Sequence, residues 1–299
     1  MRAFNFFSPS QSGKFTGVRV LNVGLLSLAL LGLPAPTLAQ DAAPATEAAA
    51  PAAEAAAPAA EADPIAEADV LMKKRGVKNL RKAAAIYKLA LDKDPKNIDL
   101  MLKRADALNG LMRVQTDGNM VLFDALSDSS KHKKIWKKHA PEALALAKKV
   151  VKARPKDTKA KSVIADAFIF HSSSLGILEA LMKGDDDEYK FHSKNLIKGK
   201  ANFEDGLGYL LMASFYTGAP WPISDGDKAV SYAEKMLKVK KSKRNLYYMA
   251  VVHHRNGDKD KALPFYKKAL GMKCKLPADR DFCAPIEREI KRAIKDIGN

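Results

Sequence analysis

Apolar residues recur at spacings of three and four from Pro64 onward, and turn-forming residues interrupt them roughly every 12 to 20 positions. This spacing places the apolar side chains on one face of an α-helix, and each interruption lets the chain reverse direction. No segment shows the alternation of apolar and polar residues that is typical of a half-buried strand. The pattern therefore predicts an all-α fold of about eleven or twelve helices over residues 64–299.

Small residues at fixed positions indicate that these helices repeat as hairpins. Residues 243–274 fit the tetratricopeptide pattern without a gap, with Ala250 on the first helix and Ala262 and Ala269 on the second, where small side chains let the helices approach closely. Ala229 lies 33 residues before Ala262, close to the repeat length of about 34. Partial copies cover residues 80–108, 140–168 and 208–239. The predicted fold is a tetratricopeptide-like helical hairpin solenoid.

The first 39 residues resemble a secretory signal peptide. Three bases and no acids accompany an apolar stretch, Val20–Leu33, that is shorter than the roughly 20 residues of a membrane span. A small-residue cleavage site ends at Ala39, so cleavage is predicted there, with an uncleaved membrane anchor as the alternative. Residues 40–63 repeat EAAAPAA, whose prolines interrupt helix, and predict a disordered linker before the repeat domain, 64–299. The predicted location is the periplasm or the exterior.

Charge narrows the class of partner. The chain carries +17 overall, and residues 64–299 carry +19, because the linker holds five acids and no base while residues 1–39 hold three bases and no acid. Such a field favours acidic partners, but the predicted export argues against nucleic acid. The lysine-rich runs 131–139 and 238–244 are interpreted as solvated faces, with contact to anionic envelope polymers as the alternative.

Two groups of residues resemble the TRAP-transporter T-component proteins. They comprise 68–75 with Leu80, Tyr87, Ala90, Leu91, Asp94 and Pro95, and 208–216 with a proline-containing loop and 226–229. The resemblance implies an exported all-helical protein that assists a periplasmic solute-binding protein and forms a homo-oligomer, a trimer with a ligand-accommodating pore. The chain differs from that family in lacking the lipoprotein cysteine, since no cysteine precedes Cys274.

The only two cysteines, Cys274 and Cys283, lie close together in the sequence. In an oxidising compartment an even count at short separation predicts a disulfide. Free thiols and metal ligation are the alternatives, although no second pair or nearby histidine completes a zinc set.

Motifs for other chemistry are missing from the sequence. The six histidines form no HExxH arrangement, and the acidic stretch 184–189 lacks the alternate acids and central glycine of a calcium loop. No nucleophile elbow, phosphate loop or dinucleotide-binding glycine pattern occurs. We therefore expect no metal, no cofactor and no enzymatic activity.

The concave face lined by the first helices of the hairpins is the predicted contact surface. In the gap-free repeat its partner-binding candidates are Arg244, Tyr247, His254 and Arg255. The two arginines can hold a carboxylate, and the tyrosine offers a rigid amphipathic contact. Earlier first helices add Asp99, Leu102, Asp106, Asn109, Lys159, Ser162 and Asp166. The alternative is that all of these are merely solvated side chains.

A long loop between two of the predicted helices supplies a further candidate. In YTGAPWPISDGDKAV (216–230), Gly218 can end the first helix and Ser224 or Asp225 can cap the second. Trp221 between two prolines is interpreted as packing over the ends of its hairpin, with contact to a partner as the alternative.

Together these features predict an exported, non-enzymatic protein that mediates protein–protein interaction. The resemblance to the T-component family favours an accessory of TRAP-type solute uptake, with a solute-binding protein as partner. The alternative is a general scaffold of a cell-envelope machine for secretion, motility or wall synthesis. Contact with a membrane is expected only through an uncleaved signal peptide.

Overall fold

The structure is a computed structural model that describes residues 63–117, 129–275 and 278–298. All of them belong to one compact unit, residues 58–299. The predicted signal peptide and the predicted linker lie outside the described residues, except for Asp63. That aspartate accepts a hydrogen bond from the backbone N–H of Ile65 at 2.9 Å and caps the first helix.

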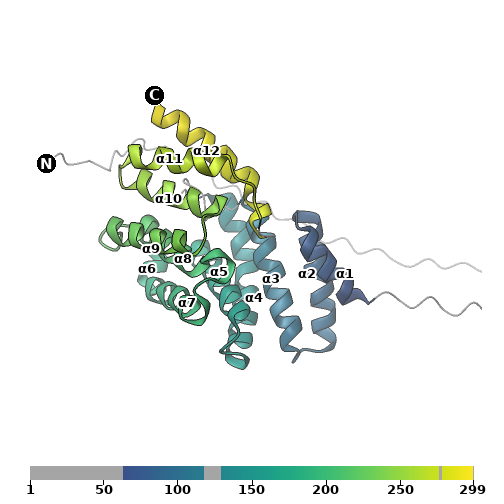
Figure 1. The fold of residues 1–299 in the computed structure, drawn as a ribbon. Coiled ribbons are helices and arrows are strands. Elements are labelled where there is room, and N and C mark those ends of the chain that lie inside the picture. Colours follow the sequence, from purple (N-terminus) through teal and green to yellow (C-terminus); the bar gives the residue numbers. More distant parts are fainter. Residues whose placement is uncertain (1–62, 118–128, 276–277, 299) are drawn as a thin grey trace, which may run out of the picture. The chain divides into compact units, whose positions relative to one another are not determined.

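The described residues are helical, with no β-strand among them, as the hydrophobic spacing predicts (Figure 1). The α-helices are α1 Pro64–Lys74, α2 Val77–Lys93, α3 Ile98–Gln115, α4 Ser130–Ala153, α5 Thr158–Leu175, α6 Ile177–Met182, α7 Asp185–Lys200, α8 Leu207–Gly218, α9 Gly226–Val239, α10 Lys243–Arg255, α11 Lys259–Leu270 and α12 Cys283–Gly298. Two short 3-10 helices, η2 Phe203–Asp205 and η3 Ala278–Asp281, precede α8 and α12.

Each helix packs mainly against its neighbours in the chain, and the first helices of successive hairpins also touch (Figure 1). Thus α3 contacts α5, and α8 contacts α10. We call the surface formed by α1, α3 and α5 the first-helix face. The arrangement is the one expected for a solenoid of helical hairpins.

Local signals in the sequence set the helix boundaries. Asn97 accepts a hydrogen bond from the N–H of Leu100 at 3.0 Å, at the start of α3. Asp157 accepts two, from the N–H groups of Lys159 and Ala160, at the start of α5. A cap of this kind contributes about 1 kcal/mol. The same caps orient α3 and α5, which supply much of the first-helix face.

The small residues that identify the repeat lie where the helices meet. Ala229, Ala250, Ala262 and Ala269 are fully buried. Around them the apolar side chains form two clusters, one running from Ala68 to Phe170 and the other from Ala165 to Ala293. The close approach of helices inferred from these alanines is therefore confirmed.

The loop between α8 and α9 follows the prediction at its ends and differs at its tip. Gly218 ends α8, and Asp225 caps α9 by accepting a hydrogen bond from the N–H of Lys228 at 2.9 Å. The preferred packing role of Trp221 is wrong, because its side chain is 87% exposed. Tyr216 instead stacks on the ring of Tyr232, with centroids 6.0 Å apart, and covers that part of the hairpin.

A disulfide joins Cys274 and Cys283, as predicted, with Cα atoms 6.2 Å apart. The loop that it closes contains η3, whose Asp281 accepts hydrogen bonds from the guanidinium of Arg75, one of them from Nε at 2.9 Å. Arg75 lies between α1 and α2, 206 residues away in the sequence. The Arg113 guanidinium of α3 also lies 5.3 Å from the ring centroid of Phe282. The end of the domain thereby contacts its beginning.

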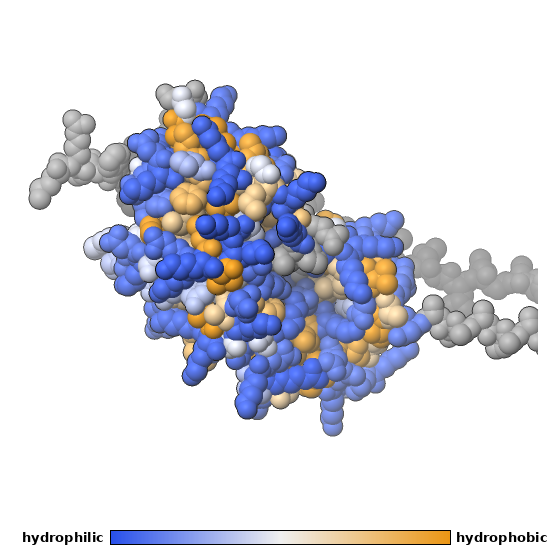
Figure 2. Space-filling model, in the orientation of Figure 1, coloured by the Kyte–Doolittle hydropathy of each residue, from blue (hydrophilic) through white to orange (hydrophobic). Residues whose placement is uncertain are grey.

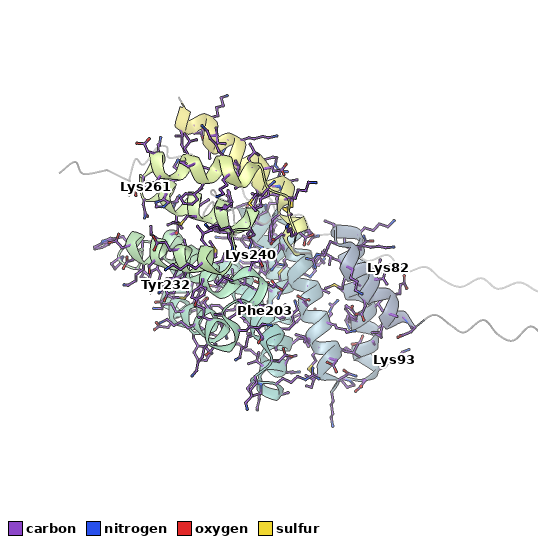
Figure 3. All side chains as sticks on the ribbon, viewed as in Figure 1. Lys82, Lys93, Phe203, Tyr232, Lys240 and Lys261 are labelled. Atoms are coloured by element: carbon purple, nitrogen blue, oxygen red, sulfur yellow. A yellow bond between two sulfur atoms is a disulfide. The ribbon has the colours of Figure 1, made fainter. Side chains whose placement is uncertain are left out.

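The face of the described residues drawn in Figure 2 is largely hydrophilic. Lys82 and Lys93 of α2, Lys240 at the end of α9 and Lys261 of α11 are exposed (Figure 3). Within the described ranges no helix is both long and apolar enough to cross a membrane.

Candidate functional site

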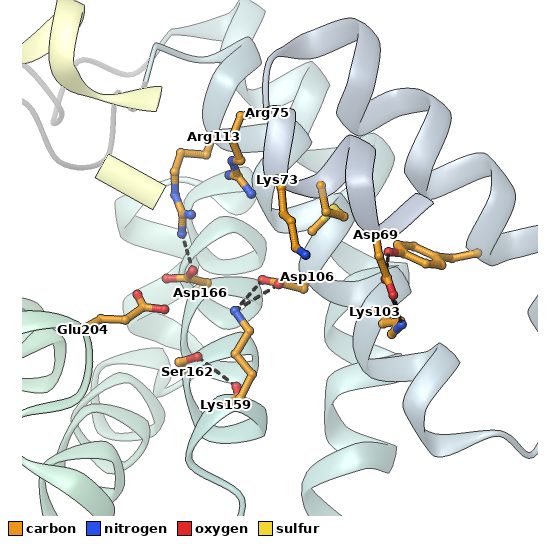
Figure 4. Close-up of a pocket in the computed structure, with 12 residues that line it drawn as sticks. Asp69, Lys73, Arg75, Lys103, Asp106, Arg113, Lys159, Ser162, Asp166 and Glu204 are labelled. Atoms are coloured by element: carbon orange, nitrogen blue, oxygen red, sulfur yellow. Dashed lines mark hydrogen bonds and ion pairs between the residues drawn. The ribbon is translucent and has the colours of Figure 1, made fainter. Parts of the chain in front are cut away.

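A cavity of about 420 Å³ opens on the first-helix face (Figure 4). Its walls come from α1, the turn after it, α2, α3, α5 and η2, and most of the side chains carry charge. The lining residues are Asp69, Met72, Lys73, Arg75, Tyr87, Lys103, Asp106, Arg113, Lys159, Ser162, Asp166 and Glu204. The volume lies within the range of about 300–1,000 Å³ that is usual for ligand pockets.

Helical spacing brings these side chains to one surface. On α5, Lys159, Ser162 and Asp166 follow one another at intervals of three and four, which places them on a single helix face. On α3, Asp106 and Arg113 are seven residues apart, two helical turns, and share a face in the same way. Contact between α3 and α5 then brings the two charged rows together.

Asp69 of α1 is held by two donors. Lys103 Nζ lies 2.6 Å from its Oδ2, and the Tyr87 hydroxyl donates a hydrogen bond of 2.6 Å to its Oδ1. Burial raises the pKa of Asp69, but the bonds from Lys103 and Tyr87 outweigh that effect and leave the pKa below its ordinary value. Asp69 is therefore a carboxylate at neutral pH, with its charge already satisfied.

Two further ion pairs cross between α3 and α5. Lys159 Nζ lies 3.0 Å from the carboxylate of Asp106, and the Arg113 guanidinium donates to Asp166. Burial lowers the pKa of Lys159, but the carboxylates of Asp106, Glu204 and Asp166 together outweigh burial, and the pKa is raised overall. These pairs leave charged groups of both signs along the cavity wall.

Glu204 of η2 differs from the other lining carboxylates in its contacts. No hydrogen bond or ion pair in the described part of the chain ends on its carboxyl group. Burial raises its pKa, and the nearby Asp166 adds to the rise, while Lys159, Arg113 and Arg244 oppose it. Figure 4 shows the Glu204 side chain beside Asp166.

The backbone that carries Glu204 has an uncommon conformation. Glu204 has φ 42° and ψ 56°, and Asp205 has φ 57°, so two consecutive residues other than glycine lie in the left-handed region. Each costs roughly 1–2 kcal/mol. Buried side chains of α10 hold the turn, since Arg244 donates to the carbonyl of Glu204 and Asn245 donates to that of Asp205 at 2.7 Å.

The structure corrects the prediction for two of the partner-binding candidates. Arg244 is 5% exposed and Tyr247 is fully buried, so neither lies on an accessible surface. Arg244 does hold a carboxylate, as its chemistry suggests, but that group is Asp279 of its own chain at 3.0 Å. The reason is that η3 and α12 pack against α10 and turn this first helix into core.

The remaining candidates lie apart from the cavity. His254 faces α11, where its Nδ1 lies 3.3 Å from the Tyr266 hydroxyl, and burial lowers its pKa. Arg255, the last residue of α10, and Trp221 are exposed. The structure thus brings none of the predicted partner-binding residues to the lining of the cavity.

Four of the contact residues predicted on the earlier first helices do lie at the cavity. Asp106, Lys159, Ser162 and Asp166 all line the cavity. Three others do not: Asn109 is buried and donates to the carbonyl of Val163 at 2.9 Å, Asp99 pairs with Arg154 at 2.7 Å, and Leu102 packs against the core.

The sequence predicted none of the other eight lining residues as contact residues, and Arg113 and Glu204 are two of them. Arg113 follows Asn109 by four residues, so one more turn of the same helical row would have found it. Glu204 lies in a connection between α7 and α8, where no periodic signal applies. Its position depends on contacts from α10, which is distant in the sequence.

The chemistry of the cavity favours recognition of polar or charged groups. Across the residues that the structure describes, no group of three or more His, Cys, Asp and Glu side chains could hold a metal ion. The wall offers ammonium, guanidinium, hydroxyl and carboxylate groups, so a ligand can be held by both donors and acceptors.

Comparison with known protein families finds no match, and neither does comparison with curated proteins. Among solved structures, a thermophilic TPR protein of Thermus thermophilus, TTC0263, is similar with a TM-score of 0.55 and 14% identity, covering 78% of this chain and 97% of that one. MamA (TM-score 0.40, 17% identity, 69% and 88% covered) and a tetratricopeptide repeat protein of Parabacteroides merdae ATCC 43184 (0.32, 15%, 79% and 98%) are more distant, and their TM-scores support no argument. The first likeness shows the fold, an all-α helical repeat of the tetratricopeptide type.

Proposed function

We propose that this chain is an exported, non-enzymatic adaptor that binds another protein through its first-helix face. The observation that carries the proposal is the open, charge-lined cavity on that face. Stacked helical hairpins present their first helices as an extended binding surface. The location rests on the signal-like features of residues 1–39 and is part of the proposal.

A charge exchange inside the cavity tests the surface. The double variant Asp106→Lys with Lys159→Asp keeps an ion pair but reverses its direction in the cavity. The matched control is Lys88→Asp with Asp92→Lys, an exposed pair on α2 outside the cavity. Cross-linking in a periplasmic extract should recover one partner with the wild type and the control, and lose it with the cavity variant. Recovery of the same partner by a folded cavity variant would contradict the proposal.

A finer version of the role is supported by the resemblance to TRAP-transporter T-components at residues 68–95 and 208–229. In that version the chain is an accessory of TRAP-type solute uptake, and a periplasmic solute-binding protein is its partner. Sedimentation of the purified chain with the solute-binding protein of the same organism should show a complex. Two separate boundaries at micromolar concentrations would refute this version and leave the general adaptor.

A second candidate role is a scaffold of a cell-envelope machine that contacts anionic polymers. The observation in its favour is the amino-terminal part of α4, where Lys131, Lys134, Lys137 and Lys138 are exposed while Trp136 is buried. Cosedimentation with isolated anionic wall polymer should then occur and weaken with salt. Charge reversal of these four lysines should abolish it.

A further inference from the structure

One carboxylate of the cavity lacks the counter-ion that each of the others has. Asp69, Asp106 and Asp166 are bound by Lys103, Lys159 and Arg113, respectively. In the described part of the chain, no such pair ends on Glu204. Glu204 is half-buried, and Lys159, Arg113 and Arg244 lie close enough to lower its pKa without forming an ion pair with it. A carboxylate that loses part of its hydration without a directly bonded partner is unfavourable. A cationic ligand would supply the missing partner.

The protein holds this carboxylate in place despite backbone strain. Glu204 lies on a turn with two left-handed residues, and Arg244 and Asn245 hold that turn from α10. Strained backbone of this kind persists only where the surroundings enforce it, and it is concentrated at functional sites. In Figure 4 the Glu204 side chain lies at one side of the group of lining residues, beside Asp166.

We propose that the cavity binds an organic cation, an ammonium or guanidinium group, with Glu204 as its counter-ion. A metal ion does not fit, because in the described ranges no group of acidic or histidine side chains could hold one. An organic cation needs a single charge-assisted hydrogen bond and a space for its stem, and the cavity of about 420 Å³ provides both.

The organic cation can come from either of two sources. One is a lysine or arginine side chain of a protein partner, and for this source the inference rests on the proposed function. The other is a free organic amine, which needs no protein partner. Probes of both kinds separate the two sources.

The test is an NMR titration of the isotope-labelled full chain, followed at the amides of residues 203–206. The probes are a short Gly/Ala peptide with one central lysine, the same peptide with norleucine, and cadaverine as a free amine. The lysine peptide should bind and the norleucine peptide should not. The Glu204→Gln variant should weaken binding at least tenfold, since it removes the charge that pairs with the ligand cation.

Glu67→Gln is the matched control, because Glu67 lies on α1 outside the cavity and pairs with the exposed Lys82 at 2.5 Å. Its affinity should equal that of the wild type. Tighter binding of the lysine peptide than of cadaverine identifies a side chain as the source, and equal or tighter binding of cadaverine identifies a free amine. Binding that is unaffected by Glu204→Gln, or matched by the norleucine peptide, overturns the proposal.

The outcome is separable from that of the proposed function. If the cavity charge exchange leaves partner capture intact while probe binding still depends on Glu204, the adaptor surface is wrong and the cation site stands. If capture is lost but no probe binds, the adaptor surface stands and the cation site is wrong. Circular dichroism of each variant excludes misfolding as the cause.

Discussion

The first helices at the two ends of the domain share a place in the repeat but have opposite surroundings. On the N-terminal side, the pair Lys103–Asp69 is 36% and 41% exposed and borders an open cavity. On the C-terminal side, the pair Arg244–Asp279 is 6% and 4% exposed, and eleven of the thirteen residues of α10 are buried.

The difference arises from the course of the chain after each helix. After α11 the polypeptide returns through the disulfide-closed loop, and η3 and α12 cover α10. The same loop also reaches the lining residues Arg75 and Arg113, through Asp281 and Phe282, but it leaves the cavity between α1, α3 and α5 open. A position in a helical repeat therefore defines which side chains face inward, while the later course of the chain decides whether they stay accessible.

Removing the buried guanidinium of Arg244 should have the largest effect on stability. Arg244→Ala leaves Asp279 buried without its partner and removes the donor to the carbonyl of Glu204. Breaking a buried pair in this way costs about 3–5 kcal/mol. Urea unfolding should show the loss, with the exposed Lys261→Ala as a control that changes stability by less than about 0.5 kcal/mol. A loss for Arg244→Ala as small as that of the control would mean that the C-terminal pair is no more structural than the N-terminal ones.

Opening the C-terminal loop should have the next largest effect. The double variant Cys274→Ser with Cys283→Ser frees a loop closed across a separation of nine residues. Chain entropy then predicts a loss of roughly 2–3 kcal/mol. Reduction of the wild type should lower its thermal midpoint to that of the variant. Equal midpoints for the oxidised wild type and the variant would show that η3 covers α10 without help from the disulfide.

Removing the negative charge of Glu204 should stabilise the folded protein at neutral pH. The pKa of Glu204 is raised on folding, so this group favours the folded state below its ordinary pKa of 4.5 and loses that contribution as pH rises through the folded-state pKa. The Asp166 carboxylate strengthens the effect, whereas Lys159, Arg113 and Arg244 moderate it.

Glu204→Gln does not titrate, so it should exceed the wild type by about 1 kcal/mol at pH 7, a gain common where function conflicts with stability. The two proteins should converge below pH 4.5, the ordinary pKa of the glutamate. Thermal melts over that range measure the difference. A variant less stable than the wild type at neutral pH would remove the argument that this carboxylate destabilises the folded state.

The smallest effect on stability is expected for a substitution beside the open cavity. Lys103→Ala removes one donor to Asp69, which keeps its hydrogen bond to Tyr87 and is partly solvated. The cost should be below about 1 kcal/mol. The pKa of Asp69 should rise, because the lysine is a main cause of its depression, and carboxyl NMR shifts across the acid range would record it. An unchanged pKa would indicate that the ion pair does not form in solution.

The sequence predicted the helices and their pairing well because those depend on local spacing. Ala250, Ala262 and Ala269 identified the hairpin, and Asp225 identified a cap. Asp106 and Asp166 were placed correctly on the inner side by the same periodicity.

The failures involve contacts between distant segments. Nothing near Tyr247 in the sequence shows that later residues will bury it, and nothing near Glu204 shows that α10 will hold its turn. Trp221 was misjudged for a related reason, since the aromatic contact of its hairpin is made by Tyr216 and Tyr232. Periodicity orients a side chain relative to its own helix, whereas its accessibility depends on the whole domain.

The contact between Arg75 and Asp281 has a consequence for how the domain unfolds. Arrays of helical hairpins behave as one-dimensional chains in which each unit is stabilised by its neighbours, and their terminal units fray first. Here a contact across 206 residues ties the first hairpin to the segment before the last helix. Loss of either terminal unit breaks that tie as well as the nearest-neighbour interface, so fraying at one end weakens the other. The domain should therefore melt in one cooperative transition, with hydrogen exchange at α1 and α12 rising together.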